Sequence, residues 1–361
     1  MRSRFFRSGL FFIIFICPAL NSLRGAELEP KVLAFYYPWY RTRAFSGEWD
    51  HWNLEGSNPD QMDSEGRREI TTAHYPSAGV YDSTDPDTIR RHLAESEKAG
   101  LDGWIVSWWG RGYQPDSVPA ILDTIAKTGS DLKITIYYEM VPGCQGYTCR
   151  NRKSEERVSG VLSDLDFIRE HYSSHPAFLK VGDRPVIFIY TRAMLQALSE
   201  WPEIIEQSRK KQDWFFSGDC ITTFTPAMAG KGFDQAHFYN PVVELNIFSA
   251  GLIPYSDFVR GLHSSGKSAA LTVIPGYDER RIPSRTLRIH QDRNSGKLYQ
   301  TLWDKAIKAE PDWVLLTSFN EWHEGSEIEP SREFQDQYLD LTAEFSQKFK
   351  LGRKKDSVVK F

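Results

Sequence analysis

Eight short apolar segments recur along this chain, separated by stretches in which apolar residues repeat with helical spacing. Each segment is only four to six residues long, which suits a buried strand better than a helix. The predicted strands are Val32–Tyr36, Gly103–Ser107, Lys133–Tyr138, Val186–Tyr190, Trp214–Ser217, Gln235–Tyr239, Ala269–Ile274 and Trp313–Thr317. Strands that alternate with helices form parallel sheets. Eight such units in 361 residues predict a single α/β domain, a (β/α)8 TIM barrel spanning residues 27–350.

Helical patterns follow most of the predicted strands. The predicted helices are Asp87–Ala99, Ser117–Lys127, Ser154–Tyr172, Pro202–Lys211, Tyr255–Ser264, Lys297–Ala309 and Phe334–Phe349. The fifth helix is the weakest prediction, because Thr222–Gly232 holds little helical pattern. Arg41–Ser83, after the first strand, is a long polar and aromatic segment. Because loops after the strands build the active site of a barrel, we expect this extended βα loop to wall the cleft.

Polar and aromatic residues gather directly after six of the predicted strands. These clusters are Tyr36–Tyr40, Ser107–Gly110, Tyr137–Glu139, Tyr190–Arg192, His237–Asn240 and Pro275–Asp278. Any single aromatic residue of this kind more often packs in a core than binds a ligand. Six clusters at one rim nevertheless favour a binding cleft. Aromatic faces stack on the apolar C–H faces of sugar rings, so the pattern predicts a carbohydrate site.

Two glutamates, Glu321 and Glu324, follow the last predicted strand. Gly325 permits a turn, which would direct both carboxylates into one cleft at a separation of about 5–6 Å. Paired carboxylates beside aromatic rings are typical of glycosidic bond cleavage. The simpler reading is that both glutamates are solvated, as most surface glutamates are. The adjacent tryptophan and buried strand favour the catalytic interpretation.

A metal site at the same place is a second alternative. His323 and Glu324 begin a pattern typical of zinc proteases, but Glu327 stands where the second histidine ligand would be required. We therefore predict no metal and no other cofactor, since two carboxylates and water suffice for hydrolysis. The net charge is −4, and no basic run is interleaved with aromatic residues, so nucleic acid is not an expected partner.

The N-terminus resembles an export signal. Arg2, Arg4 and Arg7 precede the apolar stretch Leu10–Leu20, which is short for a membrane-spanning helix and is interrupted by Pro18. We predict that residues 1–25 are a signal peptide and that the protein is periplasmic or secreted, without stable membrane insertion after cleavage. An uncleaved membrane anchor is the alternative. Residues 351–361 are predicted to form a basic C-terminal tail.

The cysteine pattern agrees with an oxidising compartment. Cys144 and Cys149 can close the small loop CQGYTC with a disulfide, which would leave Cys220 outside the pair. The sequence contains no Cys-x-x-Cys motif and no cysteine–histidine cluster with zinc spacing.

Five motifs in the sequence are similar to those of a known protein family. They are Phe35–Tyr40 (FYYPWY), His51–Asn53 (HWN), Tyr81–Pro86 (YDSTDP), Ser107–Trp109 (SWW) and Thr317–Gly325 (TSFNEWHEG). Together they resemble glycoside hydrolase family 99, and the likeness extends from about Val32 to the final helix. The resemblance implies a (β/α)8 barrel that cleaves internal α-1,2-mannosidic bonds with retention of configuration, as endo-α-1,2-mannosidases and mannanases do.

The resemblance also implies roles for the two glutamates. Glu324 matches the general acid, which later activates water as a base. Glu321 matches the carboxylate that removes the proton of the sugar 2-hydroxyl and so yields a 1,2-anhydro intermediate. In a conventional retaining mechanism Glu321 would instead attack the sugar carbon itself. The sequence does not separate these two routes.

Further residues are expected to bind the substrate, which would be a mannose-containing oligosaccharide or polysaccharide. They are Tyr37, Trp39, His51, Trp52, Trp109, Glu139, Tyr190, Tyr239, Tyr277, Asn320, Trp322 and His323. Trp109 stands where animal-type members tend to carry tyrosine, which favours mannose over glucose on the non-reducing side. The segment Tyr137–Val141 lacks the Pro-Tyr common in the animal enzymes. The resemblance therefore does not assign the residues that contact the inner sugars.

Two other functions remain possible from the sequence. One is an endo-hydrolase of the same fold that acts on another polysaccharide. The other is a carbohydrate-binding protein on a catalytically inactive barrel, which would be expected to lose one of the two glutamates. The natural glycan and the oligomeric state do not follow from the sequence.

Overall fold

The computed structural model describes residues 28–220, 232–242 and 254–358. Eight parallel strands close into a barrel, because β3 pairs with both β2 and β5 and the remaining strands pair with their neighbours around the ring. The barrel strands are β1 (Lys31–Tyr36), β2 (Gly103–Trp108), β3 (Lys133–Tyr138), β5 (Arg184–Ile189), β6 (Phe215–Asp219), β7 (Gln235–His237), β8 (Ser268–Val273) and β11 (Trp313–Leu316). All eight predicted strands are confirmed, and so is the (β/α)8 fold class.

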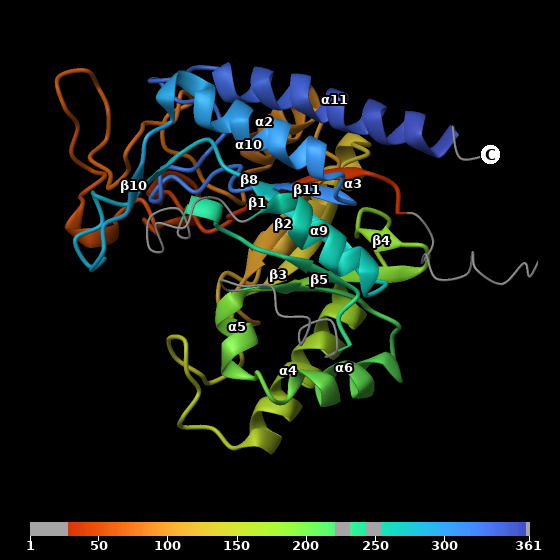
Figure 1. Ribbon diagram of the computed structural model, residues 1–361. Coiled ribbons are helices and arrows are strands. Elements are labelled where there is room, and N and C mark those ends of the chain that lie inside the picture. The colour runs from red at the N-terminus through yellow and green to blue at the C-terminus, as the bar shows by residue number, and fades with distance from the viewer. Residues whose placement is uncertain (1–27, 221–231, 243–253, 359–361) are drawn as a thin grey trace, which may run out of the picture.

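Helices surround the barrel, with α2, α10 and α11 on one side and α4 and α6 on the other (Figure 1). The long helices are α2 (Pro86–Lys98), α3 (Ser117–Thr128), α4 (Ser154–His171), α6 (Trp201–Arg209), α9 (Tyr255–Ser264), α10 (Lys297–Ala309) and α11 (Gln337–Val358). Each confirms a predicted helix. The weak prediction Thr222–Gly232 falls almost wholly outside the described residues.

The last helix is longer than predicted, because α11 continues to Val358 instead of ending at Phe349. Lys350 donates hydrogen bonds to the Gly100 carbonyl and to Asp102, both at 2.8 Å, and so fastens this part of the helix to the barrel. The segment expected to be a basic tail therefore begins as helix. The predicted signal peptide or anchor lies outside the described residues. Within those residues, no helix combines the length and apolarity needed to cross a membrane.

Several short elements were not predicted. They are α1 (Arg43–Ser46), α5 (Thr191–Gln196), the 3-10 turns Leu54–Gly56 and Asn294–Gly296, and the short strands β4 (Lys180–Val181), β9 (Tyr277–Asp278) and β10 (His290–Gln291). Most of them are only two to four residues long, which is too short for a sequence period to appear.

Alternate residues of each strand face two different cores. Leu33 and Phe35 of β1 belong to a cluster that fills the barrel together with Phe188 and Trp313. The intervening residues of the same strand pack in a second cluster with the surrounding helices. Because both faces of each strand are buried, the strands read as continuous apolar runs in the sequence.

Long loops gather on one side of the barrel, at left in Figure 1, where the segment after β1 and the β9–β10 hairpin are drawn. The two loops touch, since the Ser284 N–H donates to Glu55 at 3.2 Å. Both loops follow the carboxyl ends of barrel strands, which is the face where barrel enzymes carry their active sites. The extended loops therefore surround the rim that holds Glu321 and Glu324.

Candidate active site

The loop after β11 positions the glutamate pair. The Asn320 side chain accepts a hydrogen bond from the Tyr37 N–H at 2.8 Å and donates to the Tyr37 carbonyl at 3.0 Å, which ties this loop to the end of β1. The Ser318 hydroxyl accepts from the Glu321 N–H at 2.7 Å. Gly325 has φ +58°, and a β-carbon there would lie 3.1 Å from Asp278. The turn expected at Gly325 is confirmed, and it requires glycine.

A buried ion pair holds the far side of the same loop. Arg293 donates to Glu327 at 2.6 Å and to the Gly325 carbonyl at 3.0 Å. His74, from the long loop after β1, lies 2.8 Å from Glu327. Because Glu327 binds these two residues, it serves to anchor the loop rather than to line the site.

Glu321 is almost fully buried, with 3% of its surface exposed. Its Oε1 accepts a hydrogen bond from the His323 N–H at 3.2 Å. Burial raises the pKa of Glu321 to about 7, although the positive charge of His51, if protonated, would oppose that shift. A carboxyl with this pKa exchanges its proton readily near neutral pH, which suits a catalytic base or acid.

Glu324 meets partners from two other strands. Its Oε2 accepts from the Tyr239 hydroxyl at 3.3 Å, and its Oε1 lies 3.2 Å from the Arg285 guanidinium. The Tyr239 hydroxyl in turn accepts from Tyr37 at 2.7 Å. Burial and the nearby charge of Glu321 raise the pKa of Glu324 to about 7, and Arg285 opposes them. The effect of Glu321 on the pKa of Glu324 places the two carboxylates near each other.

Glu139 is a third buried carboxyl beside the pair. Its Oε1 accepts from the Ser107 hydroxyl at 2.8 Å, and Ser107 accepts from the Trp109 indole N–H at 3.1 Å. Burial raises the pKa of Glu139 to about 8, so this carboxyl carries a proton at neutral pH and can donate a hydrogen bond.

His323 lies against Glu321 and is itself buried. Its Nδ1 is 3.6 Å from Glu321 Oε1, and neither ring nitrogen has a hydrogen-bond partner among the described residues. Burial lowers the pKa of His323 to about 4, so the ring is neutral at neutral pH. The ring is therefore placed to accept or donate one hydrogen bond to a ligand in the site.

Aromatic rings of several strands surround the glutamates. Trp39 stacks on His51 with ring centres 4.2 Å apart, and the Tyr113 hydroxyl lies 3.2 Å from the His51 ring. Half-buried residues at this rim include five of the predicted binding residues, namely Trp39, His51, Trp109, Tyr190 and Tyr239. Tyr37 and Tyr277 are each 5% exposed and also carry polar atoms toward the pair.

Three predicted binding residues lie below the site instead of on its surface. Trp52, Asn320 and Trp322 have no exposed surface, so no substrate reaches them in this structure. The Trp52 indole donates to the Tyr81 carbonyl at 2.7 Å, and the Trp322 indole donates to the Tyr81 hydroxyl at 3.1 Å. We correct their predicted role from binding the substrate to supporting the loops that do.

Sequence reasoning did not single out Arg285 or Arg192, which both lie near the carboxylates. The loop after the seventh strand was expected at the site, but it holds four arginines between residues 280 and 288. Only the fold shows that Arg285 is the one that reaches Glu324. Arg192 stands two residues after a predicted strand end, and that position could have marked it as a residue of the barrel rim.

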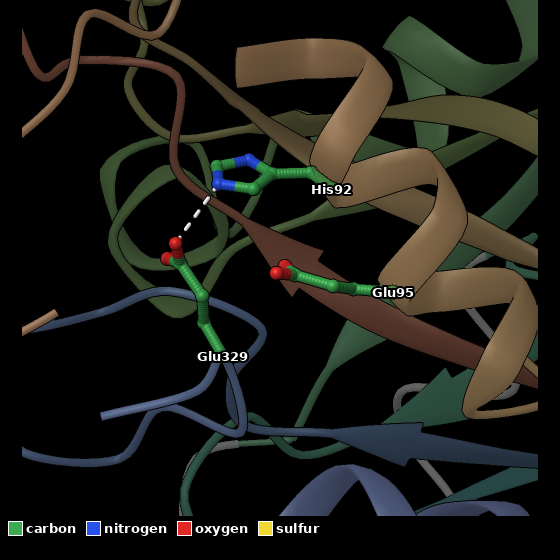
Figure 2. A group of neighbouring side chains, drawn as sticks. All are labelled: His92, Glu95 and Glu329. Carbon is green, nitrogen blue, oxygen red and sulfur yellow. Dashed lines mark hydrogen bonds and ion pairs between the residues drawn. The ribbon is translucent and has the colours of Figure 1, made fainter. Parts of the chain in front are cut away.

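A group of possible metal ligands lies behind the site, where His92 and Glu95 from α2 face Glu329 (Figure 2). His92 Nε2 and Glu329 Oε1 are 2.9 Å apart. The guanidinium of Arg91 lies 3.5 Å from Glu329 and 3.7 Å from Glu95 and so supplies a positive charge. Because Glu329 also accepts from the Trp322 indole at 3.1 Å, the group supports the catalytic loop from below.

The predicted disulfide between Cys144 and Cys149 is present in the structure. It closes the loop that follows β3. Cys220, at the end of β6, is buried and lies outside this disulfide.

A (β/α)8 barrel whose rim holds one buried and one half-buried glutamate among aromatic rings is the arrangement of a glycoside hydrolase. The model of glycosyl hydrolase family 99 matches residues 27–361. The chain belongs to glycoside hydrolase family 99, and the resemblance drawn from its motifs is confirmed.

Characterised relatives agree with this assignment. The chain is 27% identical to a glycoprotein endo-alpha-1,2-mannosidase of Rattus norvegicus, over 90% of this chain and 74% of the relative. It is 26% identical to a glycoprotein endo-alpha-1,2-mannosidase-like protein of Mus musculus, over 91% and 80% of the two chains. The solved GH99 endo-alpha-mannosidase of Bacteroides thetaiotaomicron superposes with a TM-score of 0.73 at 27% identity, covering 90% of this chain and 98% of that one.

Proposed function

We propose that this glycosidase is a retaining endo-α-1,2-mannosidase or endo-α-1,2-mannanase. The observation that carries the proposal is the pair of a buried Glu321 and a half-buried Glu324 at the barrel rim, with a pKa of about 7 for each carboxyl. Two carboxyls that titrate near neutral pH can serve as one acid and one base. The names of the relatives indicate the type of bond, α-1,2, and the sugar, mannose.

In the first step Glu324 gives its proton to the oxygen that leaves C1. Glu321 removes the proton of the 2-hydroxyl, and O2 attacks C1 from the face opposite the leaving group. In an α-mannoside the axial 2-hydroxyl is trans to that group, so this geometry is accessible. The C1–O2 bond forms as the glycosidic bond breaks, and a 1,2-anhydro sugar results.

In the second step Glu324, now ionised, takes a proton from water as the water attacks C1. The C1–O2 bond breaks, and Glu321 returns its proton to O2. Two inversions at C1 give net retention. Both glutamates end in their starting protonation states, so the cycle needs no cofactor.

A direct attack of Glu321 on C1 is the competing route. A 2-deoxy-2-fluoro mannoside with a good leaving group separates the two, because it has no 2-hydroxyl to form the anhydro sugar. We expect no turnover and no covalent adduct by mass spectrometry. A glycosyl adduct on Glu321 would instead support the direct attack.

The proposed activity is tested on purified residues 27–361 with an α-1,2-branched mannan and with a Glc-α-1,3-Man-α-1,2-Man glycan. We expect a disaccharide product, identified by mass, with the mannan preferred because Trp109 stands at the rim beside Glu139. Preference for the glucosylated glycan would contradict the role of Trp109. No product from either substrate would favour another polysaccharide.

A further inference from the structure

A cluster of three aromatic rings surrounds the guanidinium of Arg192 at the rim. The guanidinium carbon lies 4.6 Å from the ring centre of Trp109, 5.3 Å from that of Tyr147 and 5.5 Å from that of Tyr190. We call these four residues the Arg192 cluster. Trp109 and Tyr147 come from the loops after β2 and β3, and Tyr190 and Arg192 lie at the start of α5 after β5, so three separate βα segments meet here.

The guanidinium of Arg192 has N–H groups that are available to bind a ligand. Within residues 28–220, 232–242 and 254–358, no hydrogen bond or ion pair joins Arg192 to another residue. The positive charge of Arg192 opposes the rise in the pKa of Glu139 that burial causes. The Glu139 carboxyl accepts its hydrogen bond from Ser107 and not from Arg192. A half-buried guanidinium whose five N–H groups lack protein acceptors can donate to the hydroxyls of a bound ligand.

Tyr147 is held at the rim by its short loop. The disulfide between Cys144 and Cys149 closes this loop, and Gln196 donates to the Gly146 carbonyl at 2.6 Å. The Tyr147 side chain is nevertheless 48% exposed, and its hydroxyl lies 3.4 Å from that of Tyr190. A large ring that is fixed in place and left half exposed contributes little to the core and presents a face to solvent.

The Arg192 cluster is continuous with the catalytic pair. The Trp109 indole binds Ser107, and Ser107 binds Glu139, which lies beside the glutamates. On the other side, Tyr190 lies close enough to Glu324 for the charge of this carboxylate to raise the pKa of its hydroxyl. A glycan chain that leaves the catalytic centre along these residues would reach Tyr147 and Arg192.

We propose that Tyr147 and Arg192 form a further sugar-binding subsite beyond Trp109, and that the Cys144–Cys149 disulfide holds Tyr147 in it. This inference rests on the proposed function, because it assigns a place for an outer hexose of the same glycan. The tyrosine ring would stack on the C–H face of the sugar, and the Arg192 guanidinium would donate to its hydroxyls.

The test uses linear α-1,2-linked mannotetraose as the probe. Its Kd is measured by calorimetry in the Glu324→Gln protein, alone and combined with Tyr147→Ala or Arg192→Met. The kcat and KM on mannan are measured in the active protein with the same two substitutions. We expect each to raise Kd and KM about tenfold, as loss of one stacking or charged contact does, while kcat is retained.

Two variants control for non-specific effects. Tyr147→Phe keeps the ring, so its Kd should stay within about twofold of the parent value. Phe45→Ala removes another half-exposed aromatic ring, at 53% exposure, and should leave both constants unchanged. Unchanged Kd values in Tyr147→Ala and Arg192→Met would overturn the subsite. A loss of kcat of about tenfold without a change in Kd would overturn the subsite as well.

The disulfide is tested separately with the double variant Cys144→Ser/Cys149→Ser. We expect the same rise in Kd as in Tyr147→Ala, with an unaltered circular dichroism spectrum. Binding as tight as in the parent would overturn the role of the disulfide. A parent protein that cleaves mannan while the subsite variants bind normally refutes only the subsite. A parent that neither binds nor cleaves any mannoside refutes both this inference and the proposed function.

Discussion

At the scale of single residues, Glu321 and Glu324 share a pKa of about 7 but differ in their partners. Glu321 accepts from the backbone N–H of His323, which is fixed by the loop. Glu324 pairs with Arg285, whose side chain is 50% exposed and belongs to a rim loop. Burial is the main cause of the raised pKa of both carboxyls, and the charge of Arg285 opposes it in both, but only Glu324 contacts the Arg285 side chain directly.

The two glutamates should respond differently to substitution by glutamine. Glu324→Gln should lower kcat on natural mannosides by about 10²–10⁴-fold, since general acid help is lost. It should be less impaired on mannosides with activated leaving groups, which need little protonation. Glu321→Gln should be inactive on both substrates. Release of sugar by each variant measures the difference.

The exposed Glu65→Gln serves as the matched control, and its activity should equal that of the unaltered protein. Activity of Glu321→Gln equal to the wild type would remove Glu321 from the mechanism.

Removal of Arg285 should change the pH profile. The guanidinium lowers the pKa of Glu324, so Arg285→Met should let this carboxyl keep its proton to a higher pH. The acid form of Glu324 is required for the proposed first step, and the high-pH limb of kcat/KM should therefore move upward. Arg288→Met, in the same loop, is the control and should leave the limb in place. A downward shift in Arg285→Met is the contrary result.

At the scale of elements, the loop after β11 is fastened at three points. Asn320 ties it to the end of β1, Arg293 binds Glu327, and Glu329 faces His92 on α2. Each anchor comes from a different part of the chain, so the positions of the glutamates depend on the closed barrel as a whole. Without these anchors the loop would not hold two carboxylates in place by itself.

The turn at Gly325 is the most sensitive point of this loop. Gly325→Ala should cost about 1–2 kcal/mol, because φ there is positive, and the new methyl group would also meet Asp278. We expect a lower Tm, by a few degrees, together with reduced kcat as Glu324 is displaced.

Gly352→Ala is the matched control for this substitution. Gly352 lies within α11 and a β-carbon there meets nothing within 4 Å, so the protein should be stabilised, by about 0.5–1 kcal/mol. Thermal unfolding of both variants checks the pair. A Tm unchanged in Gly325→Ala would show that the turn tolerates a side chain.

At the scale of the whole molecule, the eight barrel strands and the loops that follow them place the candidate functional groups on one rim. The long loop after β1 and the loop that carries Arg285 both follow barrel strands and meet at Glu55 and Ser284. Loops that pack on each other in this way close off the sides of a cleft while the barrel below stays rigid. This division between scaffold and loops lets substrate choice change without a change of fold.

Export from the cytoplasm is a prediction at this scale. It depends on whether the predicted signal peptide is removed from the chain. We expect the full-length protein to be processed in a bacterial host, with a mature N-terminus between Asn21 and Ala26. Mass spectrometry of the periplasmic or secreted protein would locate the cleavage site. An intact Met1 in the membrane fraction would indicate the anchor, and an intact Met1 in the cytoplasm would contradict export.

The strands, the helices and the glutamate pair were predictable because their signals are local. A strand such as Trp313–Leu316 is an uninterrupted apolar run, and a helix such as α10 repeats its apolar residues every three or four positions. Glu321 and Glu324 follow the end of a strand, and in a parallel barrel that position alone places them on the active rim.

Other features were decided only by the tertiary structure. Trp52 and Trp322 read as binding residues in the sequence, yet both are fully buried beneath the site. Arg285 reaches Glu324, and Arg192 lies near Glu139, because loops from distant segments converge there. Burial and convergence depend on contacts between residues far apart in the chain, whereas a repeat of apolar residues is a property of a few neighbours. The sequence by itself therefore determined the barrel and the place of the glutamate pair on its rim, and the tertiary structure decided which side chains are exposed beside that pair.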